Sequence, residues 1–186
     1  MNKLSKADEF YRKGVILYNG VRTKSTMEEM VKLFREAAEL GHLKAMYALC
    51  KCYFVGLGVK KDMSAAKFWC LQAAEKGLEI AKRNLIYIDY RLAHKWSSNN
   101  IKAVLNSKKC GCFHCGRIFD ASEIYNSKYG LDYKFALCPY CGIDSVIPDA
   151  SGYPITEEFL EGMRNTWFGC GILMKGNKKV YIDVKL

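Results

Sequence analysis

Apolar residues recur every three or four positions through much of the first half of the chain, a spacing that predicts amphipathic helices. The pattern is clearest in residues 45–81, where Ala45, Leu49 and Tyr53 share one face of a helix. The Gly-Leu-Gly-Val run at 56–59 interrupts this helix, because glycine adopts the left-handed backbone that such a turn requires. The segment is therefore predicted to form two short helices joined by a glycine turn.

The second helix of this pair has its own start and stop signals. Asp62 precedes it and has a side chain suited to accept hydrogen bonds from its first amides. Gly77 follows it, in the position where glycine commonly ends a helix. Between these two residues, small and bulky side chains form one apolar stripe, which consists of Ala65, Ala66, Trp69, Ala73 and Ala74.

The sequence also repeats itself within the first half. The segment ELGHLKA at 39–45 is echoed by EKGLEIA at 75–81, which lies 36 positions later. Periods in this range are typical of stacked helix pairs, in which each pair buries a face that its neighbour covers. We expect about two and a half such repeats, close to the smallest number that forms a stable array.

Weaker signals bound the remaining helices of this half. We expect a first helix at 3–19, the first helix of a third repeat at 78–95, and its shortened partner at 100–108. Thr26 with Glu29 three residues later matches a capping box, so we expect a helix to begin at Thr26.

Residue for residue, the segment 45–81 resembles the repeat of the Sel-one-like family, a branch of the tetratricopeptide-type helical solenoids. One departure is Cys50, where that family usually has glycine. The resemblance implies an α-helical solenoid whose repeats assemble partner proteins along a groove and carry no chemistry. It rests on Ala45, Leu49, Tyr53, Gly56, Gly58, Val59, Asp62, Ala66, Trp69, Ala73, Ala74, Gly77 and Ala81.

The composition changes at Lys108, after which short strands and turns replace the helical pattern. We therefore predict two domains, helical repeats at 1–108 and a small α+β, zinc-ribbon-like domain at 109–186. In the second domain, Asp120 is a candidate cap for a brief helix, and Thr156 is a candidate cap for a helix that ends near Phe168. The alternating residues at the end of the chain predict a half-buried strand.

Two CxxCG motifs separated by 22 residues give the second domain its chemistry. Two residues between cysteines allow both sulfurs to reach one ion, and four thiolates suit a structural zinc with no open coordination position. Iron is the alternative metal, and four unligated thiols are the alternative without a metal. We predict one structural zinc, held by Cys112, Cys115, Cys138 and Cys141.

Two neighbouring residues compete as ligands. Cys110 or His114 could replace one of the four cysteines of the CxxCG motifs as a metal ligand, although either choice breaks the symmetry between the two motifs. The other cysteines, Cys50, Cys52, Cys70 and Cys170, lie in apolar surroundings and are expected to be buried thiols.

The sequence has few of the features that catalysis requires. Its three histidines, His42, His94 and His114, belong to no nucleophile–base pattern and to no HExxH motif. The Gly-x-Gly runs match turns better than nucleotide-binding loops. We expect that the protein is not an enzyme and has no catalytic residues.

The formal net charge is +10, and the charge is unevenly distributed. Residues 1–109 contain 21 of the 29 Lys and Arg residues but only 10 of the 19 acids. Zinc, positive charge and aromatic residues favour a nucleic-acid-binding protein as the alternative function. However, the zinc segment is slightly acidic, whereas a zinc ribbon that contacts phosphates usually supplies its own basic residues.

The favoured function is protein–protein interaction through the repeat groove. In such arrays the first helix of each pair lines the concave side, and a basic groove favours a partner with an acidic surface or segment. A role as an immunity or inhibitor protein against a toxin falls within this class. The candidate contact residues are those that lie off the predicted buried stripe, namely Tyr47, Lys51, Phe54, Arg83, Tyr87 and Tyr90.

Two further expectations concern location and source. No run of about 18 apolar residues predicts a membrane helix, and the first residues lack the apolar centre of a signal peptide, so we expect a cytoplasmic protein. Cysteines in a reducing compartment favour metal binding or burial over disulfides. The segment 112–168 resembles small bacterial cytosolic proteins, which suggests a bacterial source and implies no activity.

Overall fold

The computed structural model describes residues 5–132, 134–169, 173–175 and 178–180. The described residues form two compact units, the first ending at Ile88 and the second beginning at Asp89. The division falls within one helix, whereas the sequence suggested a boundary after residue 108. The residues that follow Asp89 on this helix belong to the core of the second unit, as Tyr90 and Ala93 show. The extent of the two folding domains stays a prediction.

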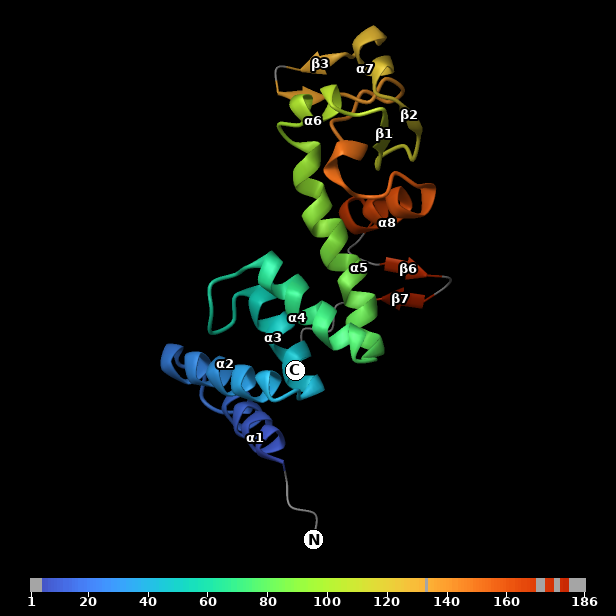
Figure 1. Cartoon of the computed structure of the whole chain (residues 1–186). Coiled ribbons are helices and arrows are strands. Elements are labelled where there is room, and N and C mark those ends of the chain that lie inside the picture. The colour runs from blue at the N-terminus through green and yellow to red at the C-terminus, as the bar shows by residue number, and fades with distance from the viewer. Residues whose placement is uncertain (1–4, 133, 170–172, 176–177, 181–186) are drawn as a thin grey trace. The chain divides into compact units, whose positions relative to one another are not determined.

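The first unit consists of consecutive helices joined by short turns (Figure 1). Each of the first three helices contacts the next one along the chain. Met30, Phe34 and Leu49 are among its fully buried side chains. Segment 45–81 is helical and contains no strand, as predicted. The helices are α1 (Lys6–Asn19), α2 (Lys24–Glu39), α3 (Leu43–Val55), α4 (Met63–Glu75) and the start of α5 (Glu79–Ala93).

The predicted signals at the ends of α3 and α4 are confirmed. Gly56 follows α3 in a left-handed conformation, with φ of 82°. The Asp62 carboxylate accepts hydrogen bonds from the amides of Ser64 and Ala65 at the start of α4. Gly77, with φ of 92°, follows the last residues of α4. These local signals set the lengths of both helices.

The predicted capping box at Thr26 and Glu29 was wrong. Thr23 is the N-cap of α2, and its hydroxyl accepts from the Thr26 amide at 3.1 Å. The Thr26 hydroxyl in turn accepts from the Thr23 amide at 2.9 Å. Thr26, the third residue of the helix, therefore completes a capping box with Thr23, and the helix begins earlier than predicted.

The second unit has short helices around a three-stranded antiparallel sheet with the strand order β2-β1-β5. The β1–β2 pair places Cys110 opposite Phe119, and the β1–β5 pair places Cys112 opposite Val146. After α5, the elements are η1 (His94–Ser97), α6 (Ile101–Leu105), β1 (Lys109–Cys112), β2 (Ile118–Asp120), α7 (Ser122–Asn126), β3 (Leu131–Asp132), β4 (Phe135–Ala136), β5 (Val146–Pro148), η2 (Asp149–Ser151), α8 (Glu157–Trp167), β6 (Leu173–Lys175) and β7 (Lys178–Val180).

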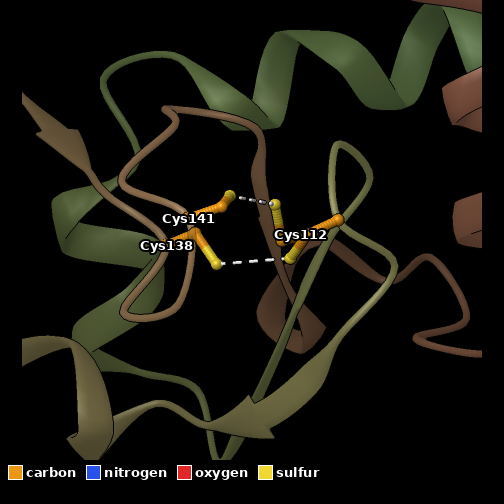
Figure 2. Close-up of side chains that lie close together, drawn as sticks. Cys112, Cys138 and Cys141 are labelled. Atoms are coloured by element: carbon orange, nitrogen blue, oxygen red, sulfur yellow. Dashed lines mark hydrogen bonds between the residues drawn. The ribbon is translucent and has the colours of Figure 1, made fainter.

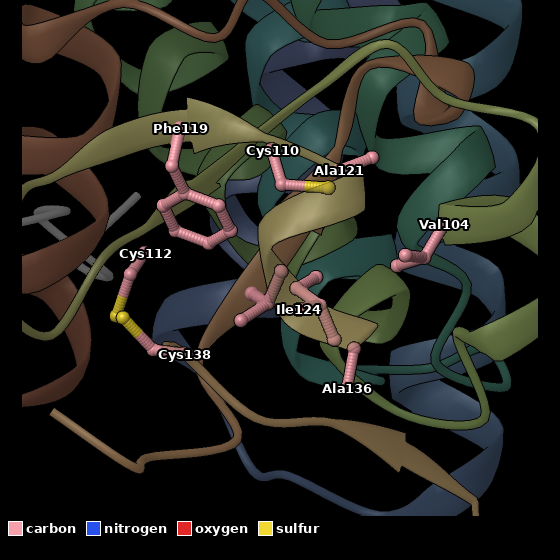
Figure 3. Close-up of a cluster of buried hydrophobic side chains, with 9 residues drawn as sticks. Val104, Cys110, Cys112, Phe119, Ala121, Ile124, Ala136 and Cys138 are labelled. Carbon is pink, nitrogen blue, oxygen red and sulfur yellow. The ribbon is translucent and has the colours of Figure 1, made fainter. Parts of the chain in front are cut away.

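One core of this unit lies beside the sheet and includes the cysteine region (Figure 3). Its members come from α6, α7, the strands β1, β2, β4 and β5, and adjoining turns, so that short elements share one apolar cluster. A second cluster joins the end of α5 to α8, with Tyr90, Phe159 and Leu160 among its buried residues. The first cluster consists of Val104, Cys110, Cys112, Phe119, Ala121, Ile124, Ala136, Cys138 and Val146.

Asn100 connects separate segments of this unit through its buried amide. The side chain donates to the Val146 carbonyl at 2.9 Å and accepts from the Ala136 amide at 2.9 Å. Asn100 is only 2% exposed, so water cannot readily replace these partners. Its hydrogen bonds hold β5 and β4, which flank the second cysteine motif in the sequence.

Two predictions about short helices were wrong. Residues 100–108 were expected to complete a third helix pair, but α6 contacts β4 and η2, and Val104 belongs to the core of the second unit. Asp120 was expected to cap the brief helix, but it lies in β2 and its amide donates to Glu123 Oε1 at 2.9 Å. Tertiary contacts thus set the position of α6, whereas α7 begins after Ala121 without a side-chain hydrogen bond at its N-cap.

The cap of the last long helix is confirmed. The Thr156 hydroxyl accepts from the Phe159 amide at 3.2 Å, and α8 ends with Phe168 as its C-cap. Of the predicted C-terminal strand, residues 178–180 form β7, which pairs with β6, while 181–186 lie outside the described residues. No helix in the described part of the chain is both long and apolar enough to cross a membrane.

Candidate metal centre

The two cysteine motifs fold into matching turns. In the first, the Cys112 amide donates to the Arg117 carbonyl at 2.9 Å, and the Gly116 amide donates to the Cys112 carbonyl at 2.8 Å. In the second, the Cys138 amide donates to the Ile143 carbonyl at 3.0 Å, and the Gly142 amide donates to the Cys138 carbonyl at 2.9 Å. The two turns thus repeat one hydrogen-bond pattern at equivalent positions.

The glycine of each turn is needed for its backbone conformation. Gly116 has φ of 80° and Gly142 has φ of 74°, in the left-handed region that residues with a side chain rarely adopt. The space at Gly142 is also filled, because an added Cβ would lie 2.9 Å from the Tyr129 ring. This explains why the motif is CxxCG on both sides.

The turns bring four sulfur atoms together, all within 4.8 Å of one another. Cys112 Sγ lies 3.7 Å from Cys141 Sγ, and Cys115 Sγ lies 3.6 Å from Cys138 Sγ (Figure 2). A tetrahedral zinc with Zn–S bonds of 2.3 Å separates its sulfurs by about 3.8 Å. The observed separations therefore fit a four-coordinate ion without rearrangement of the backbone.

Backbone amides point at the sulfurs. The Cys112 sulfur accepts from the amides of His114 and Cys115, and the Cys138 sulfur accepts from those of Tyr140 and Cys141. Such donors stabilise negative charge on sulfur. The same arrangement in both motifs is what a site for thiolates requires.

The short distances between the sulfur atoms change the pKa values of the cysteine thiols. The hydrogen bond with Cys138, together with burial, raises the pKa of the Cys112 thiol, whereas the same bond lowers the pKa of Cys138 to about 5. Burial raises the pKa of Cys141 to about 11. A bound cation favours the thiolate form at every position, because its charge offsets their mutual repulsion.

The two competing ligand candidates lie elsewhere. Cys110 is fully buried in the apolar core, where burial raises the pKa of its thiol to about 12. His114 is exposed, and its ring stands edge-on to the Phe168 ring at 5.0 Å. Within the described residues, neither belongs to the group of side chains that could hold a metal.

The other predicted structural thiols are also buried. Cys50, Cys52 and Cys70 have exposed fractions of 2% or less. Burial raises the pKa of the Cys52 thiol to about 12, as expected for an unreactive core residue. Cys170 lies outside the described residues.

The family model of the Sel1 repeat matches residues 31–42 and 43–78. The matched region runs from α2 through α4, and Sel1 repeats commonly mediate protein–protein interaction. No curated protein and no solved structure matches the chain. The second unit, with its cysteine site, lies outside the region similar to the Sel1 repeat.

The structure separates the six predicted partner-contact residues into two groups. For three of them, the prediction that they lie off the buried stripe was wrong. The exposed fractions of Tyr47, Lys51 and Tyr90 are only 9%, 5% and 7%. The Tyr47 hydroxyl accepts from the Asn84 amide at 2.6 Å, and the Lys51 ammonium lies over the Tyr47 ring. These side chains have structural contacts and offer little surface.

The other three residues remain accessible. Arg83 is exposed, while Phe54 and Tyr87 are partly buried and bring their ring centroids within 6.0 Å of each other. The sequence pattern missed the burial of Tyr47 and Lys51 because α3 is covered on more than one face. All of its residues from Ala45 to Cys52 are buried.

A link between the two cysteine turns was also missed. The Arg117 guanidinium, just after the first turn, lies 4.4 Å from the Tyr140 ring centroid of the second turn. The Tyr140 hydroxyl donates to Glu123 Oε2 at 2.6 Å, which lowers the pKa of that carboxylate. Only the aromatic–basic composition of the motifs could have suggested this link.

Proposed function

We propose that the chain is a non-catalytic protein–protein interaction module with one structural zinc. The observation that carries the proposal is the match of the Sel1 repeat to a region that folds as consecutive helix pairs. Helix-pair repeats expose extended surfaces along the array, and these surfaces are suited to binding other chains. The repeat region is therefore the proposed binding part, and the second unit is the proposed zinc part.

Zinc is the proposed metal because its chemistry fits the donor set. Four thiolates around one ion leave no coordination position for water or substrate, so such a site stabilises the fold and does not catalyse. Cys112, Cys115, Cys138 and Cys141 are the proposed ligands. The second unit has short strands, so a central ion would supply much of its cohesion.

The surroundings of the three histidines support a non-catalytic role. His42 caps α3, where its Nδ1 accepts from the Ala45 amide at 3.1 Å. The His94 ring lies 3.7 Å from the Trp167 ring, between centroids. His114 lies on the surface beside Phe168. Each thus has a structural contact, and none lies among the four cysteines.

The proposed partner is a protein with an acidic surface or segment. The excess of basic residues in 1–109 would speed association with such a partner and select against basic ones. A scaffold role and a role as a toxin inhibitor both fall within this proposal. The free thiols of the described cysteines are consistent with a reducing compartment, and we propose the cytoplasm.

Nucleic-acid binding is the second candidate, and the charge of +10 favours it. A pull-down from native cytosol, with and without nuclease treatment, discriminates the two candidates. We expect a defined protein to be retained after nuclease treatment. Loss of all retained material after nuclease would contradict the proposal and favour nucleic acid.

A further inference from the structure

A cavity of about 510 Å³ opens in the first unit where the start of α2 meets the turn between α3 and α4. The turn approaches α2 closely, because a Cβ on Gly58 would collide with the Met27 carbonyl. The cavity is therefore formed by a fixed contact between two elements. It is lined by Arg22, Thr23, Lys24, Met27, Glu28, Gly56, Leu57, Gly58, Val59 and Lys60.

The charges around the cavity are mostly positive. Arg22, Lys24 and Lys60 line it, and Glu28 is the one acid among its described lining residues. Glu28 lies 4.0 Å from the Lys24 ammonium, and the Lys24 side chain is 92% exposed. Such an exposed pair contributes little stability. Three basic residues against one acid leave the lining with a formal net charge of +2.

The cavity also has an apolar part and one preorganised cation. Met27, Leu57 and Val59 contribute apolar side chains to its lining. The Arg22 guanidinium lies 4.6 Å from the Tyr18 ring centroid, and its Nε donates to the Tyr18 carbonyl at 3.4 Å. A guanidinium held in this way loses less conformational freedom when it binds a carboxylate.

We propose that this cavity binds an acidic peptide segment of the protein partner, with carboxylates at Arg22 and Lys60 and one apolar side chain against Met27 and Leu57. Cations beside an apolar floor match a segment in which acidic and aliphatic residues are neighbours. The inference rests on the proposed interaction function and adds to it the place of contact, which differs from the residues predicted from the sequence.

The test uses the full chain and a fluorescein-labelled peptide with the sequence Glu-Glu-Leu-Glu-Glu and blocked ends. The variant Arg22→Glu/Lys60→Glu reverses two lining charges. The control Lys32→Glu/Lys76→Glu makes the same change in net charge at exposed positions that do not line the cavity. We expect the first variant to weaken peptide binding about tenfold or more at low salt, and the control to weaken it about twofold or less.

Amide chemical shifts then locate the bound peptide. We expect changes at residues 22–28 and 56–60, and no binding of the matched Gln-Gln-Leu-Gln-Gln peptide. Equal losses in the two variants, shifts elsewhere, or no binding of the acidic peptide would overturn the inference. A protein partner that is retained after nuclease treatment can also be tested against the Arg22→Glu/Lys60→Glu variant. If it binds this variant as tightly as it binds the unaltered chain, the inference fails and the proposed function stands. If only nucleic acid is retained, the proposed function fails.

Discussion

Asn100 and Cys138 are both buried in the second unit, but only Cys138 belongs to a local sequence motif. The four cysteines could be predicted because the CxxCG spacing by itself specifies two turns with convergent sulfurs. Asn100 could not, because its partners lie 36 and 46 residues away and nothing local marks it. Single polar residues that satisfy distant backbone groups become visible only in three dimensions.

Replacing Asn100 by alanine should destabilise the second unit. The Ala136 amide and the Val146 carbonyl would lose their buried partner, at a cost on the order of 3 kcal/mol in the free energy of unfolding. Asn106→Ala is the matched control, since the Asn106 side chain is exposed and should change stability by less than about 0.5 kcal/mol. Urea denaturation with zinc present measures both variants, and equal stabilities would contradict the assigned role.

Cys138→Ser should abolish zinc binding, because serine does not replace a thiolate in a four-sulfur site. Residues 110–150 should lose ordered structure, while α1–α4 persist. Cys110→Ala is the control, because Cys110 is equally buried but lies outside the cysteine site, and this variant should retain its metal. Metal analysis together with amide spectra checks the prediction. Zinc retained by the Cys138 variant would exclude the proposed ligand set.

At the scale of elements, the helix ends with local signals were predicted well and those decided by packing were not. Asp62, Gly56 and Gly77 act within a few residues of their own backbone, so their roles follow from sequence. The α6 helix has no such signal, and its contacts with β4 and η2 placed it in the second unit. The buried state of Lys51 was missed for the same reason.

Gly58 should be the more sensitive of two left-handed glycines. Both Gly58→Ala and Gly77→Ala impose backbone strain of about 1 kcal/mol, because φ is 68° and 92° respectively. Only the Gly58 variant also drives its Cβ into the Met27 carbonyl, whereas nothing lies within 4 Å at Gly77. We expect Gly58→Ala to cost about 3 kcal/mol. Thermal denaturation that ranks Gly77→Ala as equal or worse would contradict this packing of the turn.

The cap of α3 should make stability depend on pH. Burial lowers the pKa of His42 in the folded chain, with Asp8 acting in the opposite direction and Lys44 in the same one. Because the unfolded chain then binds the proton more readily, stability is highest above the unfolded pKa near 6.5 and falls as pH decreases below it. His42→Asn keeps a capping acceptor without this titration. Its loss of stability between pH 7 and pH 5 should be smaller, and an unchanged pH profile would contradict the role of His42.

At the scale of the whole molecule, charge and chemistry are divided along the chain. Most basic residues lie in the half that contains the repeats, and the cysteine site lies in the other half. This division could be predicted because both features are visible in sequence. The place of the proposed binding surface could not, since its cavity forms only where the start of α2 meets the turn between α3 and α4.

Nucleic-acid binding should be weak and strongly dependent on salt. If only the basic surface contacts phosphates, affinity for duplex DNA and single-stranded RNA should be unselective and should fall steeply between about 50 and 200 mM salt. Fluorescence anisotropy over this range measures it, with Lys60→Glu and Lys82→Glu as variants of comparable expected effect. Tight and sequence-selective binding that survives moderate salt would favour the nucleic-acid function instead.

We propose that the working form of the protein contains one chain, one zinc and a protein partner. Native mass spectrometry of the chain isolated from nuclease-treated native cytosol, under conditions that retain metals, measures all three at once. The predicted result is a complex with one zinc per chain and one defined protein. A chain that carries no zinc, or that retains no protein after nuclease treatment, would contradict the account.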